Sequence, residues 1–160
     1  MAVSIRPATS ADVPTLGRLG ALMVRTHYEF DPKRFMAVSP QTETRYGAFL
    51  ESQFGKPDVI VLVAELDGEV AGYVYAGLEG YDYMALRGPA GALYDVVVDP
   101  THRRNGVGRV LVSAAMDFLR SRGAPRVVLS TAEHNEEAQR LFARAGFRRT
   151  MIEMTAELND

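Results

Sequence analysis

The amino-acid sequence predicts a mixed α/β fold in which a central mixed sheet carries helices on both faces. Two patterns favour this class. Asp67-Gly68 is a two-residue hairpin turn between apolar runs, which indicates a pair of antiparallel strands. Later in the chain, a helical pattern joins two strand-like runs, and a crossover of this kind connects parallel strands. With 160 residues, of which 47% are hydrophobic, residues 1–160 have the length and the core of a single domain.

The expected elements follow the order β-α-α-β-β-β-α-β-α-β. Ser10 and Asp12 offer N-caps for a helix that reaches about residue 28, and Pro14 is tolerated in its first turn. A second helix is expected over residues 41–54, because its apolar residues share one face. The strands are expected where the sequence is continuously apolar or alternates, at residues 3–6, 59–66, 69–78, 92–98, 126–132 and 148–158.

Two more helices are expected between the later strands. One begins after Gly106 and ends near Gly123, with apolar residues spaced for one face. The other is capped by Asn135 and ends at Gly146, which stands where a C′ glycine is typical. Both helices therefore have sequence signals at their ends as well as along one face.

The composition excludes several classes of function. The formal net charge of −2 gives no basic field for nucleic acid, and no apolar run approaches the ~20 residues that span a bilayer. Because there is no cysteine, disulfides, a thiol nucleophile and Cys-ligated zinc are excluded, and the three histidines are widely separated. We therefore expect no metal, no nucleic acid partner and no membrane contact. We expect a cytoplasmic protein, because the N-terminus has no apolar signal core.

The stretch VDPTHRRNGVGRVLV, residues 98–112, indicates an anion site. It leaves a strand, adds two glycines and three arginines (Arg103, Arg104 and Arg109) and starts a helix at once. Exposed amides and the positive end of the dipole at a helix N-terminus bind anions. The dinucleotide pattern would need a glycine at Leu111, and the ATP-type G-K-[S/T] is absent. The alternative is a tight turn with solvated arginines and no ligand.

The same stretch resembles the Gcn5-related N-acetyltransferase (GNAT) family. Residues 103–108, Arg-Arg-Asn-Gly-Val-Gly, match that family's Q/R-x-x-G-x-G/A, and V-x-V-x-P precedes them at Val96, Val98 and Pro100. AEHNEEAQRLFARAGF, residues 132–147, is similar to the family's second cofactor segment. The element order also matches over nearly the whole chain. The resemblance implies the GNAT-like acyl-coenzyme A N-acyltransferase fold.

The resemblance also implies a reaction and a co-substrate. An acetyl group would move from acetyl-coenzyme A to a primary amine by direct attack in a ternary complex. The amine would belong to a small molecule, a peptide or protein N-terminus, or a lysine. The pyrophosphate would lie on the amides of residues 104–109, and the pantetheine would pair with the backbone of the strand before the loop, where the two parallel strands splay apart. The implied cofactor-binding residues are Val96, Val97, Val98, Arg103, Arg104, Asn105, Gly106, Val107, Gly108, Arg109, Asn135, Phe142 and Arg144.

The general acid departs from the family pattern. The family usually reads L-Y-x-x-x-G-F in the second segment, and its tyrosine protonates the departing thiolate. Here Phe142 stands at that position and has no hydroxyl. A thiol pKa of ~8.5 makes the thiolate a tolerable leaving group, so the loss slows the reaction without abolishing it. Tyr94 or Tyr28 could supply the proton instead.

Asp95 is the candidate general base. It interrupts the apolar run of residues 93–98, where a carboxylate is costly unless it is partnered or functional. The sequence supports equally the alternative that Asp95 is a buried aspartate with a structural partner. Glu133 and His134 are second choices, whereas His27 reads as an ordinary histidine. Acceptor recognition is expected in the first two helices and in residues 79–91, because the cofactor takes the other side.

Two further expectations concern catalysis and assembly. The alternative function is a catalytically weak coenzyme A-binding regulatory module that acts through partner contact, which Phe142 favours slightly.

As a strand, residues 148–158 would leave an apolar edge of the sheet, which proteins avoid exposing. We therefore expect a homodimer joined through the C-terminal strands. The alternative is a monomer whose edge is shielded by charges such as Glu153 and Glu157.

Overall fold

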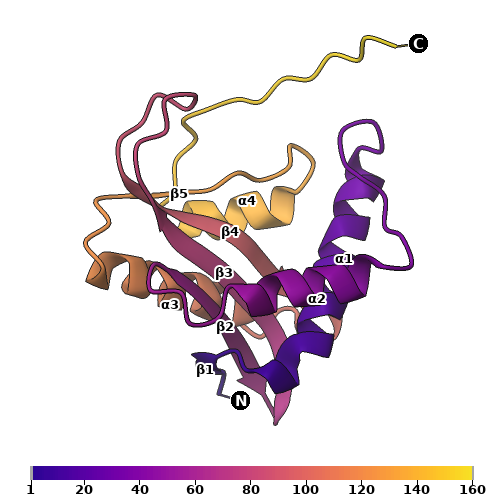
Figure 1. The fold of residues 1–160 in the computed structure, drawn as a ribbon, viewed down its shortest axis with the longest axis vertical. Helices are drawn as coiled ribbons and strands as arrows, with labels where there is room; N and C mark the ends of the chain where they lie inside the picture. The colour runs from indigo at the N-terminus through magenta and orange to yellow at the C-terminus, as the bar shows by residue number, and fades with distance from the viewer. Residues whose placement is uncertain (1, 160) are drawn as a thin grey trace.

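The computed structural model describes residues 2–159 and confirms the mixed α/β fold (Figure 1). Its described part holds a five-stranded mixed sheet in the order β1-β2-β3-β4-β5. None of its helices is long and apolar enough to cross a membrane. The strands are β1 (Ser4–Pro7), β2 (Val59–Leu66), β3 (Glu69–Glu79), β4 (Ala90–Val98) and β5 (Val127–Val128). The helices are α1 (Val13–Phe30), α2 (Thr42–Ser52), α3 (Val107–Ser121) and α4 (Glu136–Arg144), with short 3-10 turns η1 (Ser10–Asp12) and η2 (Pro100–His102).

The pairing of the strands follows the two sequence signals. Asp67 and Gly68 both have positive φ, 54° and 79°, as a type I′ turn requires, and β2 pairs antiparallel with β3. The crossover through α3 brings β5 alongside β4 in parallel, with Gly91 opposite Val127. Both the hairpin and the parallel pair are therefore confirmed.

Helices cover both faces of the sheet. On one face α1 and α2 bury Leu16, Leu19 and Leu50 against Val63 and Tyr73. On the other face α3 buries its apolar stripe against β2, β3 and β4, and α4 packs its half-buried apolar side chains onto the same cluster. The two faces thus differ in content: one carries the first two helices, and the other carries the helices that flank the glycine-rich loop.

The chain between β1 and α1 is held by a buried carboxylate. Asp12 accepts hydrogen bonds from both terminal nitrogens of Arg6, at 2.8 and 2.9 Å, and from the backbone N–H of Thr9 at 2.8 Å. The hydrogen bonds from Arg6 lower the pKa of the Asp12 carboxyl, against the effect of burial. A carboxyl whose pKa is lowered on folding adds stability above its unfolded pKa of ~3.9 and loses it as the pH falls.

We expect Asp12→Asn to destabilise the protein by about 2 kcal/mol at neutral pH, because hydrogen bonds to a charged group are lost. The difference from the wild type should shrink as the pH falls below ~4, where the wild-type carboxyl itself becomes protonated. Thermal denaturation of both proteins across the acid range measures this. A difference that stays constant with pH would assign the effect to packing instead of charge.

Two of the expected strands were wrong in extent. The strand expected at residues 126–132 pairs with β4 only through Val127 and Val128. Residues 148–158 belong to no strand of the described sheet, and their side chains are exposed. An alternating sequence predicts an extended backbone, but a strand also needs a neighbouring edge to pair with. The segment after α4 instead leaves the sheet and runs away from it as an extended arm (Figure 1).

Candidate acetyl-coenzyme A site

A β-bulge in β4 organises the site. Tyr75 of β3 lies opposite Asp95, and the next residue, Ala76, lies opposite Leu93, so Tyr94 is the extra residue of β4. Side chains normally alternate between the faces of a sheet, but the bulge shifts this alternation by one. As a result Asp95 points to the α1 and α2 side, where it contacts Tyr46, while Leu93 belongs to the opposite, α3 side.

The bulge also changes which residues of β4 direct their backbone N–H and C=O groups toward β5. Before the bulge, the N–H of Gly91 donates to the carbonyl of Arg126, on the β5 side. After it, the N–H of Asp99 donates to Ala71 on the β3 side. Because backbone groups alternate between the two edges of a strand, Val96 and Val98 direct theirs toward β5.

No strand takes up those groups among residues 2–159, because β4 and β5 separate early. Their last paired residues are Ala92 and Val128. We call the β5-facing backbone of residues 93–98 the free edge of β4. Val96 and Val98 are half-buried beside it, whereas Val97 has its side chain buried on the α1 and α2 side and pairs with Tyr73. The expected splaying of the two strands is therefore present, and Val97 does not face the space between them.

The loop after β4 forms an anion-binding arrangement. Arg104 and Gly106 both have positive φ, 70° and 76°, and Gly106 is the N-cap of α3. Gly106 has no side chain with which to satisfy the first amides of α3, so these are available to a ligand. Left-handed residues next to a helix N-terminus are typical of backbone nests for anions. The guanidinium groups of Arg103, Arg104 and Arg109 are exposed around this loop.

Gly108 lies where α3, α4 and β4 meet. A Cβ atom there would lie 3.2 Å from Leu141 of α4 and 3.6 Å from Val98 at the free edge. Asn135, the N-cap of α4, accepts a hydrogen bond from the N–H of Ala138 at 3.1 Å, so its expected capping role is confirmed. Gly108, Leu141 and Val98 thus border one region between α3, α4 and the free edge.

The other implied cofactor residues are spread around this region. Phe142 is half-buried and packs edge-on against Phe147, with ring centroids 5.8 Å apart. Arg144 is exposed in the last turn of α4, at the opposite end of that helix from Asn135. Asn105 donates from its side chain to the carbonyl of His102, which stabilises the loop itself.

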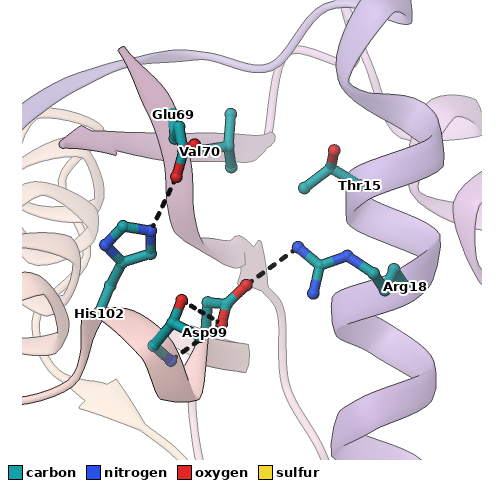
Figure 2. Close-up of a pocket in the computed structure, with 7 residues that line it drawn as sticks. Thr15, Arg18, Glu69, Val70, Asp99 and His102 are labelled. Atoms are coloured by element: carbon teal, nitrogen blue, oxygen red, sulfur yellow. Dashed lines mark hydrogen bonds and ion pairs between the residues drawn. The ribbon is translucent and has the colours of Figure 1, made fainter. Parts of the chain in front are cut away.

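A polar cavity of about 360 Å³ lies beside the start of the same loop (Figure 2). Asp99 accepts hydrogen bonds from the N–H and hydroxyl of Thr101 and from Arg18 of α1, at 2.9–3.0 Å. Burial acts to raise the pKa of Asp99, but these hydrogen bonds outweigh it and the pKa is lowered. Across the cavity, His102 faces Glu69 at 3.3 Å. Asp99 thus pairs with Arg18 of α1, and His102 contacts Glu69 of β3, so both elements are fixed to the loop.

Asp95 sits in a buried cluster with two tyrosines. Its carboxylate accepts hydrogen bonds from the hydroxyls of Tyr46 and Tyr73, at 2.5 and 3.0 Å, and only 8% of the residue is exposed. Burial raises the pKa of the Asp95 carboxyl, although the tyrosine hydrogen bonds act in the opposite direction. The carboxylate is therefore both partnered, as the structural alternative requires, and shifted toward the pKa range of a general base.

The extra residue of the bulge, Tyr94, is 41% exposed on the same side. Its hydroxyl donates to Glu79 at 2.7 Å, and the other oxygen of Glu79 contacts the guanidinium of Arg87. Burial and the hydrogen bond to Glu79 raise the pKa of the Tyr94 hydroxyl, so it stays protonated at neutral pH. The ring of Tyr75 packs beside Tyr94, with centroids 4.7 Å apart.

Comparison with known proteins decides the family. The model of the acetyltransferase (GNAT) family matches residues 23–147. This chain belongs to the GNAT family. The matched range includes the bulged β4, the glycine-rich loop and α4.

Individual relatives and solved structures match different shares of the chain. Mycothiol acetyltransferase of Thermobispora bispora is 40% identical over 96 residues, which cover 58% of this chain and 31% of that protein. The chain therefore spans about a third of this relative. A variant of the BH1408 protein of Bacillus halodurans has the same fold, with a TM-score of 0.83 at 21% identity over 98% of this chain and 99% of that one. Aminoglycoside N-acetyltransferase AAC(6')-Iy, in a complex with CoA, has a TM-score of 0.73 at 18% identity over 98% and 94% of the two chains.

None of the remaining sequence candidates is a hydrogen-bond partner of Asp95, although His27 is close enough to act on the pKa of its carboxyl. Glu133 and His134 are exposed in the turn before α4. His27 stacks edge-on against Phe35, and its Nδ1 lies 2.8 Å from the carbonyl of Met23, as an ordinary helix histidine would. Tyr28 is 38% exposed on α1.

Sequence reasoning missed the partners that complete the GNAT site. Tyr46 and Tyr73 bind Asp95, while Glu79 binds both Tyr94 and Arg87. These pairs join residues that are 8 to 49 positions apart in the chain. The sequence signal for them was limited to the tyrosines of β3 and of the loop after it.

Proposed function

We propose that this protein is an acetyl-coenzyme A-dependent N-acetyltransferase, with one catalytic domain over residues 1–160 acting in the cytoplasm. The free edge of β4 beside the anion-binding loop carries this proposal. An extended pantetheine pairs with a free strand edge as an added strand does. The amides at the start of α3 and the three arginines suit the pyrophosphate, which extends the ligand from Val98 toward Gly106.

In the proposed reaction, a primary amine attacks the thioester carbonyl directly. The carbon–nitrogen bond forms, the carbon–sulfur bond breaks, and coenzyme A leaves as the thiol. Asp95 takes a proton from the acceptor ammonium, whose pKa is ~10.4 for a lysine side chain. A backbone N–H at the free edge, near Val96 or Val98, stabilises the tetrahedral oxyanion.

Tyr94 is our candidate for the acid that protonates the departing thiolate. Phe142 has no hydroxyl at the usual GNAT position, whereas Tyr94 stands in the bulge beside Asp95 and is protonated at neutral pH. Glu79 accepts the hydrogen bond from its hydroxyl and is itself held by Arg87. As the tetrahedral intermediate collapses, the amine nitrogen loses its second proton, which returns to Tyr94 through solvent, and the proton on Asp95 is released to solvent.

We expect Tyr94→Phe to lower kcat by about 100-fold, as the loss of a general acid does. If the proton is what the variant lacks, adding Phe142→Tyr should restore part of the rate, because a hydroxyl returns at the usual GNAT position. Steady-state rates of the wild type and the single and double variants measure this. Full activity in Tyr94→Phe would remove Tyr94 from the mechanism.

The acceptor is expected to be an amine with an apolar portion. The side of the sheet that carries Asp95 also carries a row of three rings, in which Phe49 meets Tyr75 in a T-shaped contact and Tyr75 packs at a tilt against Tyr94. Phe49 is 47% exposed, so this row is accessible from outside. Aromatic faces next to a carboxylate attract a cation with apolar groups beside it. A small-molecule amine or a peptide amine has this chemistry.

The test is thiol release from acetyl-coenzyme A in the presence of small amines, peptides with free N-termini and lysine peptides. We expect release that depends on one class of amine, with the acetylated amine identified by mass spectrometry. Phe142 also favours a second function, a coenzyme A-binding module with weak catalysis. Tight binding of coenzyme A with no amine-dependent release would support that function and contradict ours.

We also propose that the protein forms a homodimer through its C-terminal segment. Met151, Ile152, Met154 and Leu158 are 72–96% exposed there, and large apolar side chains gathered in one exposed segment mark an interaction site. Light scattering at micromolar concentration should give a dimer mass, and Met154→Lys should lower it toward the monomer. A monomeric wild type would contradict the homodimer, and a dimer unaffected by Met154→Lys would place the interface elsewhere.

A further inference from the structure

We propose that the C-terminal arms of two copies pair as an antiparallel β-ribbon centred on Glu153. The arm is defined here as residues 148–159. This inference rests on the proposed homodimer and not on the acetyl transfer activity. The second copy is the only partner it requires, because one sequence supplies both strands of the ribbon.

The backbone of the arm is available to pair with another strand. Among the described residues, it takes part in no strand pairing, and the last backbone hydrogen bond before it is that of Phe147 to Phe142. Figure 1 shows it extending away from the sheet, past the end of α1. A second extended segment satisfies such a backbone most directly, by strand addition.

The arm sequence is complementary to itself in one antiparallel register. With Glu153 opposite Glu153 of the second copy, Ile152 lies opposite Met154, and Arg149 lies opposite Glu157. Residues directly opposite in an antiparallel pair share a face. One face of the ribbon therefore joins apolar side chains at its centre, and the other carries two Arg149–Glu157 ion pairs, related by the two-fold axis.

The structure offsets the charge repulsion at the centre of this register. Two Glu153 carboxylates at the two-fold axis would repel each other. In each copy, however, Glu153 accepts two hydrogen bonds from Arg34, at 2.5 and 2.8 Å, and this lowers the pKa of the Glu153 carboxyl. Arg34, in the loop after α1, thus compensates the charge at the axis and fixes the arm where the ribbon would form.

The experiment reverses one charge at a time. In Arg149→Glu, both ion pairs of the ribbon become Glu–Glu contacts, and in Glu157→Arg both become Arg–Arg contacts. We expect each variant alone to dimerise about 10-fold more weakly than the wild type, because like charges directly opposite are destabilising. Light scattering and sedimentation over a concentration series give the dissociation constants.

The decisive sample is the mixture of the two variants. A heterodimer of Arg149→Glu with Glu157→Arg has two attractive pairs, so the mixture should dimerise as tightly as the wild type. The same holds for the double variant on its own. As a matched control, Arg140→Glu reverses an exposed arginine of α4 outside the arm and should leave the dimer unchanged.

Three outcomes would overturn the proposal. A monomeric wild type would refute the homodimer on which the ribbon rests. A wild-type dimer that neither single reversal weakens would exclude the ribbon while leaving a homodimer through another surface. Weakened single variants whose mixture stays weak would exclude this register. Thiol release, measured on the same samples, tests the proposed activity separately.

Discussion

Gly108→Asp is expected to weaken acetyl-coenzyme A binding by at least about 100-fold, or ~2.7 kcal/mol. The new side chain would start 3.2 Å from Leu141 and 3.6 Å from Val98, and therefore would enter the region between α4 and the free edge of β4. It would also place a negative charge in the first turn of α3, where the pyrophosphate is expected. Titration calorimetry with coenzyme A and with acetyl-coenzyme A measures the loss.

Gly108→Ala is the matched control for this prediction. Its Cβ meets only the end of the flexible Leu141 side chain closely, and that side chain can move by a few tenths of an ångström. The GNAT pattern also accepts alanine here. We expect Gly108→Ala to keep the fold and to bind within about 10-fold of the wild type. Unchanged affinity in Gly108→Asp would contradict the assignment of the site.

Asp95→Asn is expected to lower kcat by about 100-fold or more while leaving the affinity for acetyl-coenzyme A unchanged. The amide has the shape of the carboxylate and can still accept hydrogen bonds from Tyr46 and Tyr73, but it is not a base at neutral pH. Steady-state kinetics against pH should also show loss of the acid limb that the Asp95 carboxyl gives to the wild type. A wild-type rate and pH profile in the variant would make Asp95 purely structural.

Tyr46→Phe provides the comparison for Asp95. The Tyr46 hydrogen bond favours the charged carboxylate, so its removal should move the acid limb of the pH–rate profile to higher pH.

The pKa of Asp95 also makes the free energy of unfolding depend on pH. Because the Asp95 pKa is raised on folding, its contribution is full below the unfolded pKa of ~3.9 and is lost as the pH rises through the folded pKa. Asp95→Asn should therefore gain stability relative to the wild type as the pH rises through the acid range.

Local signals in the sequence were enough for most of the fold. The Asp67-Gly68 turn fixes the β2–β3 hairpin, and the glycines at 106 and 146 mark the ends of helices where the backbone has positive φ. These features depend on residues that are neighbours in the chain. The extent of β5 and the state of residues 148–158 depend on whether a distant edge is available for pairing. No local pattern contains that information, so both strands were overestimated.

The candidate site likewise combines features set by neighbouring residues with features set by distant strand pairing. The loop of residues 103–109 is one continuous segment, and its arginines and glycines could be recognised together. The bulge at Tyr94 could not, because it exists only in the register between β3 and β4. That register is what turns Asp95 to the α1 and α2 side and exposes the backbone of Val96 and Val98.

A crystal structure of the protein with coenzyme A tests the central claim most directly. We expect the pyrophosphate within hydrogen-bonding distance of the backbone amides of residues 104–109, and the pantetheine paired with Val96 and Val98 along the free edge of β4. Coenzyme A bound elsewhere, for example with its phosphates in the cavity between Arg18 and His102, would contradict the site and the mechanism built on it.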